Sequence, residues 1–126
     1  MAKCDEGYLC EICGEEVESI VDSDLYLRFV IGLLDPETLH TSAERHLRCN
    51  PQLAQFIRAD GFELVEVEGA FGRDELDPDF VSERDALVTR GYARLQEIAA
   101  IRAREELSIL EYPLPEVQES LRRQAE

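Results

Sequence analysis

Two pairs of cysteine and histidine residues constrain this chain more than any other feature. Cys10 and Cys13 are separated by two residues and are followed by Gly14. His46 and Cys49 have the same spacing, and 32 residues separate the two pairs. Zinc prefers four tetrahedral nitrogen and sulfur ligands, and a two-residue spacer lets one tight turn aim both side chains at a common point. The sequence therefore predicts a closed zinc site formed by Cys10, Cys13, His46 and Cys49.

The same residues leave other arrangements open. Disulfides are one alternative, although they are rare in reducing compartments. Cys4 is a free thiol near the terminus in the preferred interpretation, but it is also the main rival to His46 as the fourth ligand. His40 is expected to be a solvated or helix-end histidine. Gly14 agrees with a zinc knuckle, because the chain must reverse after the second cysteine and glycine adopts positive φ without steric cost.

The residues after the second pair predict a helix. Asn50 is a favoured N-cap residue, Pro51 suits the first helical position, and apolar residues follow on one face. A Cys-x2-Cys-Gly knuckle followed by a His-x2-Cys-Asn-Pro helix start resembles the treble-clef zinc fingers. The resemblance covers residues 7 to 60 and matches a ligand pattern rather than one particular family. It implies a structural zinc ion, although the 32-residue spacer is longer than a minimal hairpin needs and one ligand is histidine.

The rest of the chain predicts one more helix, one strand and a long terminal helix. Caps at residues 22–24 precede an apolar stripe with helical spacing that extends to Leu34. Residues 62–67 alternate between apolar and acidic and predict a half-buried strand, with Tyr8 and Leu9 as its neighbour. Residues 80–112 have a helical pattern that opens at Asp77-Pro78 or at Ser82 and stops before a proline pair. The tail from residue 114 is expected to be a short amphipathic turn or disordered.

These elements predict an α+β fold that is mostly α. Residues 1–61 are expected to form a treble-clef-like zinc module with an inserted helix. Residues 62–126 are expected to form an acidic strand and loop, followed by the long helix and its short tail. The long helix offers a surface for homodimerisation, and packing against the inserted helix of the same chain is the alternative.

The charge of the chain limits its partners. There are 28 acidic and 13 basic residues, giving a formal net charge of −15. Residues 63–85 alone carry nine acidic residues against Arg73 and Arg84, a net charge of −7. This balance opposes binding to nucleic acid and to anionic membranes, and it favours a basic protein partner. No apolar stretch reaches the roughly 18 to 20 residues of a membrane span, and no secretory signal is present, so a cytoplasmic location is expected.

The motifs of the common enzyme classes are missing. The zinc-deaminase, zincin, P-loop and nucleophile-elbow patterns do not occur, and two complete ligand pairs leave a zinc ion no open position for water. The acidic cluster at Asp74, Asp77 and Asp79 lacks the calcium-loop pattern and is interrupted by Pro78. The sequence therefore predicts a non-enzymatic, zinc-stabilised protein-interaction module. A zinc-finger regulator associated with nucleic acid and a zinc-linked thiol redox switch are the alternatives.

Overall fold

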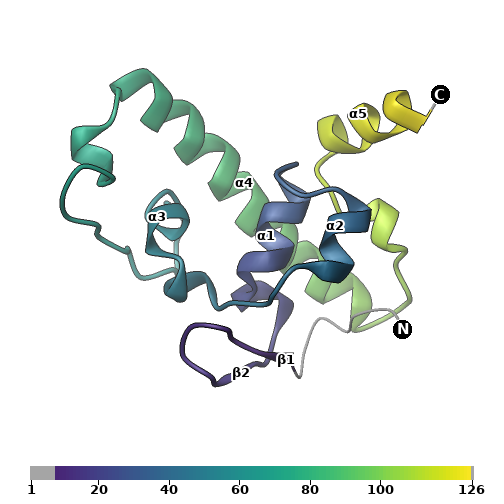
Figure 1. Ribbon diagram of the computed structural model, residues 1–126. Coiled ribbons are helices and arrows are strands. Elements are labelled where there is room, and N and C mark those ends of the chain that lie inside the picture. The colour runs from purple at the N-terminus through teal and green to yellow at the C-terminus, as the bar shows by residue number, and fades with distance from the viewer. Residues whose placement is uncertain (1–7, 126) are drawn as a thin grey trace.

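The computed structural model describes residues 8–125 and consists mainly of helices joined to one small sheet (Figure 1). This arrangement confirms the expected α+β, mostly α class. The elements in chain order are β1 (Tyr8–Leu9), β2 (Glu16–Val17), η1 (Ile20–Asp22), α1 (Asp24–Val30), α2 (Pro36–Thr41), η2 (Leu47–Cys49), α3 (Pro51–Ala54), η3 (Arg73–Glu75), α4 (Pro78–Arg102), η4 (Ile109–Glu111) and α5 (Pro115–Ala125).

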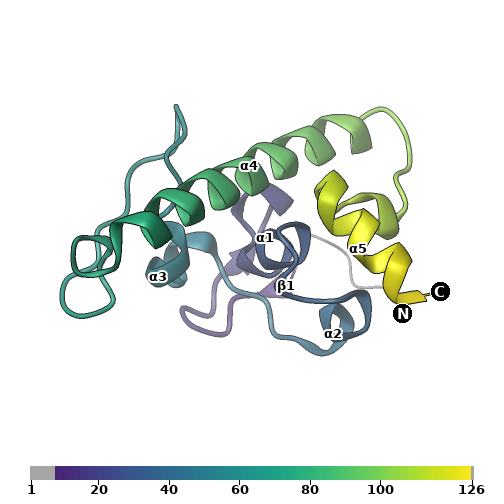
Figure 2. The same ribbon diagram turned by 90° about the horizontal axis from the view of Figure 1, so that it is seen from above.

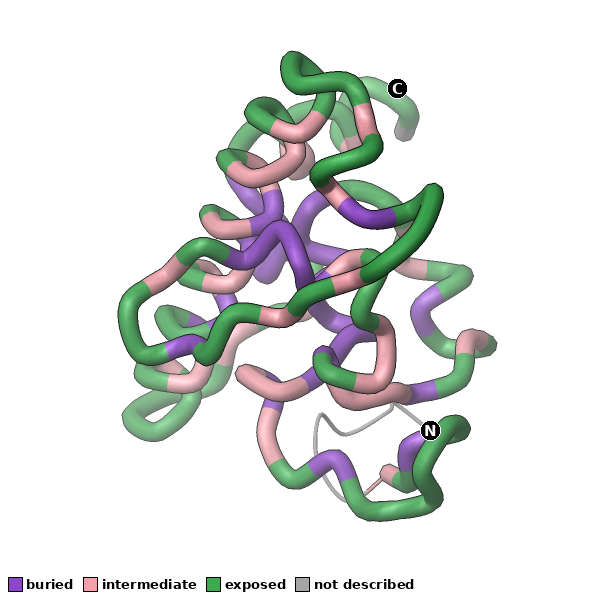
Figure 3. The backbone as a smooth tube through the Cα atoms, turned by 90° about the vertical axis from the view of Figure 1, so that its left-hand side faces the viewer, coloured by how far each residue is buried: buried purple, intermediate pink, exposed green. Residues whose placement is uncertain are grey.

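A single hydrophobic core joins the N-terminal and C-terminal parts of the chain. Figure 2 shows α4 as a long rod with α3, α1 and α5 along one side of it. The buried positions gather between these helices (Figure 3). Fully buried residues of α1, such as Leu25 and Phe29, share the core with Val88, Leu95 and Ile98 of α4. Because this core is close-packed, truncating Leu95 to alanine is expected to cost about 2–5 kcal/mol.

The inserted helix α1 is shorter than its apolar stripe predicts. Its N-terminus is capped by the side chain of Ser23, which accepts from the amide of Tyr26. The helix ends at Val30, because Gly32 takes a positive φ of 91°. The amides of Gly32 and Leu33 bond back to the carbonyls of Phe29 and Arg28, which is a Schellman motif. Leu33, which belongs to the apolar stripe, is therefore 49% exposed.

The strand predicted at residues 62–67 is wrong in the part of the chain that the structure describes. Tyr8 pairs with Val17 and Leu9 with Glu16, so β1 forms a hairpin with β2 instead of joining residues 62–67. The latter segment has no regular secondary structure. The alternation of apolar and acidic residues indicates that residues 62–67 prefer an extended backbone. Pairing β1 with β2 nevertheless costs less chain entropy than pairing β1 with residues 62–67, because the hairpin closes a much shorter loop.

The long helix α4 begins as predicted and ends early. The Asp77 side chain caps it by accepting from the amide of Phe80, and Pro78 occupies the first turn. The helix stops at Arg102, ten residues before the predicted end, and the chain turns back through η4. No helix among the described residues is long and apolar enough to cross a membrane.

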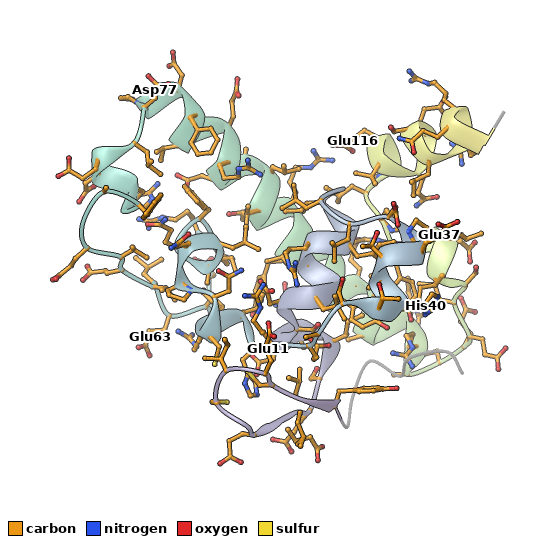
Figure 4. All side chains as sticks on the ribbon, in the orientation of Figure 1. Glu11, Glu37, His40, Glu63, Asp77 and Glu116 are labelled. Carbon is orange, nitrogen blue, oxygen red and sulfur yellow. The ribbon has the colours of Figure 1, made fainter. Side chains whose placement is uncertain are left out.

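The tail forms a regular helix rather than a short turn. α5 docks beside α1 and α4 through the backbone bond from the Leu114 amide to the Val30 carbonyl, 3.0 Å long. Arg90 of α4 donates two hydrogen bonds to the Glu116 carboxylate, at 2.6 and 2.9 Å. Figure 4 places Glu116 at the start of α5, on the side that faces α4. Proline at the first helical position and amphipathic spacing explain why this segment is helical once a surface receives it.

Candidate metal centre

The first pair, Cys10 and Cys13, lies on the knuckle that closes the β1–β2 hairpin. The amide of Cys10 donates to the Glu15 carbonyl at 2.8 Å, and the amide of Gly14 donates to the Cys10 carbonyl at 2.9 Å. Gly14 has a φ of 79°, which agrees with the sharp reversal expected of it. The turn leaves the Cys10 side chain buried and the Cys13 side chain exposed. Both sulfurs therefore belong to one short, hydrogen-bonded loop.

The second ligand pair lies where the chain enters η2 and α3. His46 precedes η2 and forms an isolated antiparallel bridge with Ser23, which ties the pair to the start of α1. Cys49 ends η2, and Asn50 and Pro51 open α3, as the sequence predicts. The Asn50 side chain makes no cap hydrogen bond to α3, however, and its amide group donates to Asp24 at 2.8 Å.

The two pairs meet although 32 residues separate them. The potential ligand atoms of Cys10, Cys13, His46 and Cys49 all lie within 4.8 Å of one another, so this group could hold a metal ion. The His46 Nδ1 atom is 3.3 Å from the Cys13 sulfur and 3.8 Å from the Cys49 sulfur. Tetrahedral zinc with bonds of about 2.0–2.3 Å separates neighbouring ligand atoms by about 3.5–3.8 Å. The size and the composition of the cluster thus fit a metal ion with tetrahedral thiolate and imidazole ligands.

The orientation of the His46 ring is fixed by the hairpin. Its Nε2 atom lies 2.9 Å from the backbone carbonyl oxygen of Glu16 and can only be the donor there. Nδ1 is consequently the atom that faces the sulfurs and offers a lone pair to a metal. Burial opposes the charged imidazole, but the Glu16 carbonyl and the thiols of Cys10 and Cys13 outweigh it and raise the pKa of His46 to about 9. A metal ion must therefore displace a proton from Nδ1.

The thiols of Cys10 and Cys49 differ strongly in their tendency to ionise. Burial opposes ionisation of Cys10, but amide hydrogen bonds from Cys13, His46 and Ile12 outweigh it and lower the pKa of this thiol to about 6. Burial raises the pKa of the Cys49 thiol to about 12, and the adjacent sulfurs of Cys10 and Cys13 contribute to the rise. A bound divalent cation removes this conflict, because it stabilises every thiolate that coordinates it.

A buried carboxylate holds the second pair against α1. Glu44 is only 4% exposed, and its carboxylate accepts from the Ser23 hydroxyl at 2.9 Å and from the Arg45 amide at 2.9 Å. It also accepts from the Leu25 amide at 3.4 Å, which places negative charge at the N-terminus of α1. The Glu44 carbonyl receives the amide of Glu11, a residue of the knuckle, at 2.9 Å. One residue therefore links α1, the knuckle and the extended segment that leads to His46.

A second buried carboxylate, Asp24, completes the connection. It is fully buried and accepts from Arg28 at 2.9 Å, from Arg45 at 3.2 Å and from Asn50 at 2.8 Å. Arg45 also lies 3.4 Å from the carboxylate of Glu11, which Figure 4 places beside the hairpin. These contacts pair the charges of Asp24 and Arg45, which lie beside the second pair. Arg45 serves the carboxylates rather than the sulfurs.

Sequence reasoning identified the four clustered side chains but missed their supports. The Glu16 contact uses a backbone carbonyl, which no residue type reveals. Glu44 stands among polar residues and carries no sequence signal of burial. His40 lies exposed on α2, apart from the hairpin, as expected (Figure 4). Cys4 lies outside the described residues, so its role as a rival ligand stays a prediction.

The fold and the site together define a mostly helical protein with a Cys3His cluster that could hold a metal ion. No protein-family model, no curated protein and no solved structure matches the chain. The functional argument therefore depends on the geometry of the cluster and of the surfaces around it.

Proposed function

We propose that the protein is a small zinc-stabilised interaction module in which one zinc ion, bound by Cys10, Cys13, His46 and Cys49, has a structural role. The observation that carries the proposal is the convergence of the four ligand atoms within 4.8 Å. Three sulfurs and one imidazole nitrogen form the ligand set of closed, tetrahedral zinc sites. Four protein ligands complete the shell, so no position is left for a catalytic water.

The surroundings of the cluster support a structural role. β1 and β2 contain two residues each, and hairpins of this size are at best marginally stable alone. A zinc ion that joins the hairpin to the start of α3 would stabilise it, with apparent binding free energies of about 10 kcal/mol or more in small zinc domains. The knuckle and the helix start also support the likeness to treble-clef fingers. A reducing compartment such as the cytoplasm suits this chemistry, because the ligands must stay reduced.

An interaction role agrees better with the surface than nucleic-acid binding does. The net charge of −15 repels phosphate backbones. Two arginines of α4 are engaged within the chain and do not offset it: Arg90 binds Glu116, and Arg94 donates to the carbonyls of Glu111 and Tyr112. Arg48 lies over the ring of Phe62. A protein partner with basic character therefore remains the best-supported class.

Native mass spectrometry of the full chain tests the metal proposal. The protein purified without chelator should carry one zinc ion, and cobalt in its place should give the absorption of a tetrahedral site with several thiolates. Cys13→Ser should bind either metal far more weakly, whereas Cys4→Ser, the matched control, should retain it. Bare protein under these conditions, or equal retention by the Cys13 variant, would overturn the proposal.

A further inference from the structure

The segment between α3 and η3 has a sequence that favours a β-strand, but its backbone pairs with no other strand among the described residues. Residues 63–68 run without a turn, a bend or any regular element. Their apolar members, Leu64, Val65 and Val67, are residues that fit a pleated strand when a neighbour is present. Within residues 8–125, no backbone hydrogen bond joins the amides of residues 64–68 to another backbone group. The local preference for a strand is thus unsatisfied in the free chain.

The two faces of this segment differ as they do in a half-buried strand. The side chains of Val65 and Val67 are half-buried, whereas those of Leu64, Glu66 and Glu68 are exposed. Leu64 is 52% exposed, although it is apolar. A cavity of about 360 Å³ runs along the segment and is lined by Leu64, Val65, Glu66, Val67, Glu68, Arg58, Arg73 and Asp74. Space is therefore available beside the unpaired backbone.

The charge around the segment is strongly negative. Glu63, Glu66 and Glu68 lie on it, and residues 63–85 carry a net charge of −7. Figure 4 shows Glu63 at the margin of the molecule, where its carboxylate is open to solvent. The two arginines of the cavity do not reverse this sign, because Arg73 is in an ion pair with Asp85 and Arg58 is a single charge.

We propose that residues 64–68 bind an extended, basic segment of a partner protein by strand addition. The unpaired amides, and the carbonyls other than that of Val67, which packs against Gly72, would pair with the backbone of that segment. Its lysine or arginine side chains would face Glu66 and Glu68, and the aliphatic stem of another would cover Leu64, since opposed residues on one face of a sheet contact one another. The inference deepens the interaction role proposed above by naming its surface and the chemistry of its partner.

The same charges exclude two other occupants. A second copy of this chain paired through the segment would place glutamates opposite glutamates, and like charges in opposed positions are destabilising. A nucleic acid would bring phosphates against the acidic surface. Charge complementarity therefore selects a basic polypeptide.

A peptide that alternates four lysines with three valines tests the proposal against the full, zinc-loaded chain. Amide hydrogen exchange, read residue by residue, should show residues 64–68 unprotected in the free protein and slowed at least tenfold when the peptide saturates it. A control peptide keeps the four lysines and replaces the valines by proline, which cannot form the strand ladder. If charge alone caused binding, both peptides would bind equally and the proposal would be wrong.

Two charge-matched protein variants locate the site. The double substitution Glu66→Lys with Glu68→Lys should lower the affinity for the lysine–valine peptide by about tenfold or more. Glu105→Lys with Glu106→Lys changes the net charge equally on exposed residues that follow α4, and it should have a much smaller effect. Equal weakening by both variants, protection at other amides, or no binding at millimolar peptide would overturn the inference.

Zinc content is measured in the same samples. If the zinc-loaded protein does not bind the peptide, the strand-addition proposal is wrong and the zinc proposal is unaffected. A metal-free protein that binds the peptide with protected amides at residues 64–68 refutes the structural zinc ion alone.

Discussion

Gly91 of α4 lies so close to Ile31, the residue after α1, that a Cβ atom on Gly91 would come within 2.4 Å of the Ile31 Cγ2 atom. The Leu27 Cδ1 atom would be 2.9 Å away. The absence of a side chain at this one position therefore lets the inserted helix and the long helix approach each other. The contact joins segments that are about 60 residues apart in the sequence, at the centre of the hydrophobic core.

Gly91→Ala should destabilise the protein. In a helix interior, alanine stabilises the helix by up to about 1 kcal/mol relative to glycine. Overpacking of a close-packed core costs about 1–3 kcal/mol, and Ile31 is β-branched and buried, so it cannot move aside cheaply. The net effect should be a loss in the free energy of unfolding, measured by urea titration. Gln96→Ala, on the exposed side of the same helix, should change it by less than about 0.5 kcal/mol. A Gly91 variant as stable as the parent would show that the helices are not in close contact.

Glu44→Gln should weaken both the fold and the metal site. The substitution keeps the shape but removes the charge that three donors face, at a cost of about 1–3 kcal/mol in the free energy of unfolding. Because Glu44 positions the segment that leads to His46, the affinity for zinc should fall about tenfold or more, as for other residues that support ligands. Competition with a chromophoric chelator measures this affinity. Glu37→Gln, on the exposed face of α2, is the control, and equal behaviour of the two variants would argue against the positioning role.

Removal of the metal should loosen the hairpin first. If zinc occupies the cluster as proposed, chelation takes away the ion that would join the sulfurs and the His46 ring, and the strands of two residues each are marginal alone. We expect amide exchange to rise most in residues 8–17 and 45–50, and the free energy of unfolding to fall by about 3 kcal/mol or more. In Cys13→Ser, added chelator should change neither quantity. Exchange that is unaffected by chelation of the parent protein would contradict a structural ion.

Docking of α5 should depend on pH through Glu116. Hydrogen bonds from Arg90 lower the pKa of Glu116 from 4.5 to about 2. A carboxyl whose pKa is lower in the folded state stabilises that state above its unfolded pKa, and this contribution is lost as the pH falls from about 4.5 to about 2. Glu116→Gln should remove this dependence and increase the opening of α5 near neutral pH, read from the NMR signals of its amides.

Glu119→Gln is the matched control for Glu116. Hydrogen bonds from Arg122 and Arg123 lower the pKa of Glu119 as well, but both partners lie within α5. This variant should leave the docking of α5 near that of the parent. If both variants opened α5 equally, the bond to Arg90 would have no special part in docking. Metal loss at low pH affects the parent and the variants alike and cancels in the comparison.

Local signals in the sequence predicted much of the fold. Asp77 and Pro78 begin α4, Ser23 caps α1, and Pro51 takes the first position of α3, since each of these features depends on neighbouring residues only. The wrong predictions arose where a distant contact decides. Residues 62–67 have a strand pattern but find no neighbour, and the helical pattern of residues 80–112 is broken after Arg102, where the chain turns back toward α5.

The sequence by itself determined the four residues that could hold a metal, because the spacing within each pair is a property of a single turn. It also determined the acidic character of the surface, which follows from composition. Only the tertiary structure decided that the two pairs meet, that Nδ1 of His46 faces the sulfurs, and that Glu44 is buried behind them. These relations arise from the packing of α1 against α4 and from the backbone bonds that tie residues 44–46 to the knuckle and to the start of α1. Such contacts between distant segments have no local signature in a chain.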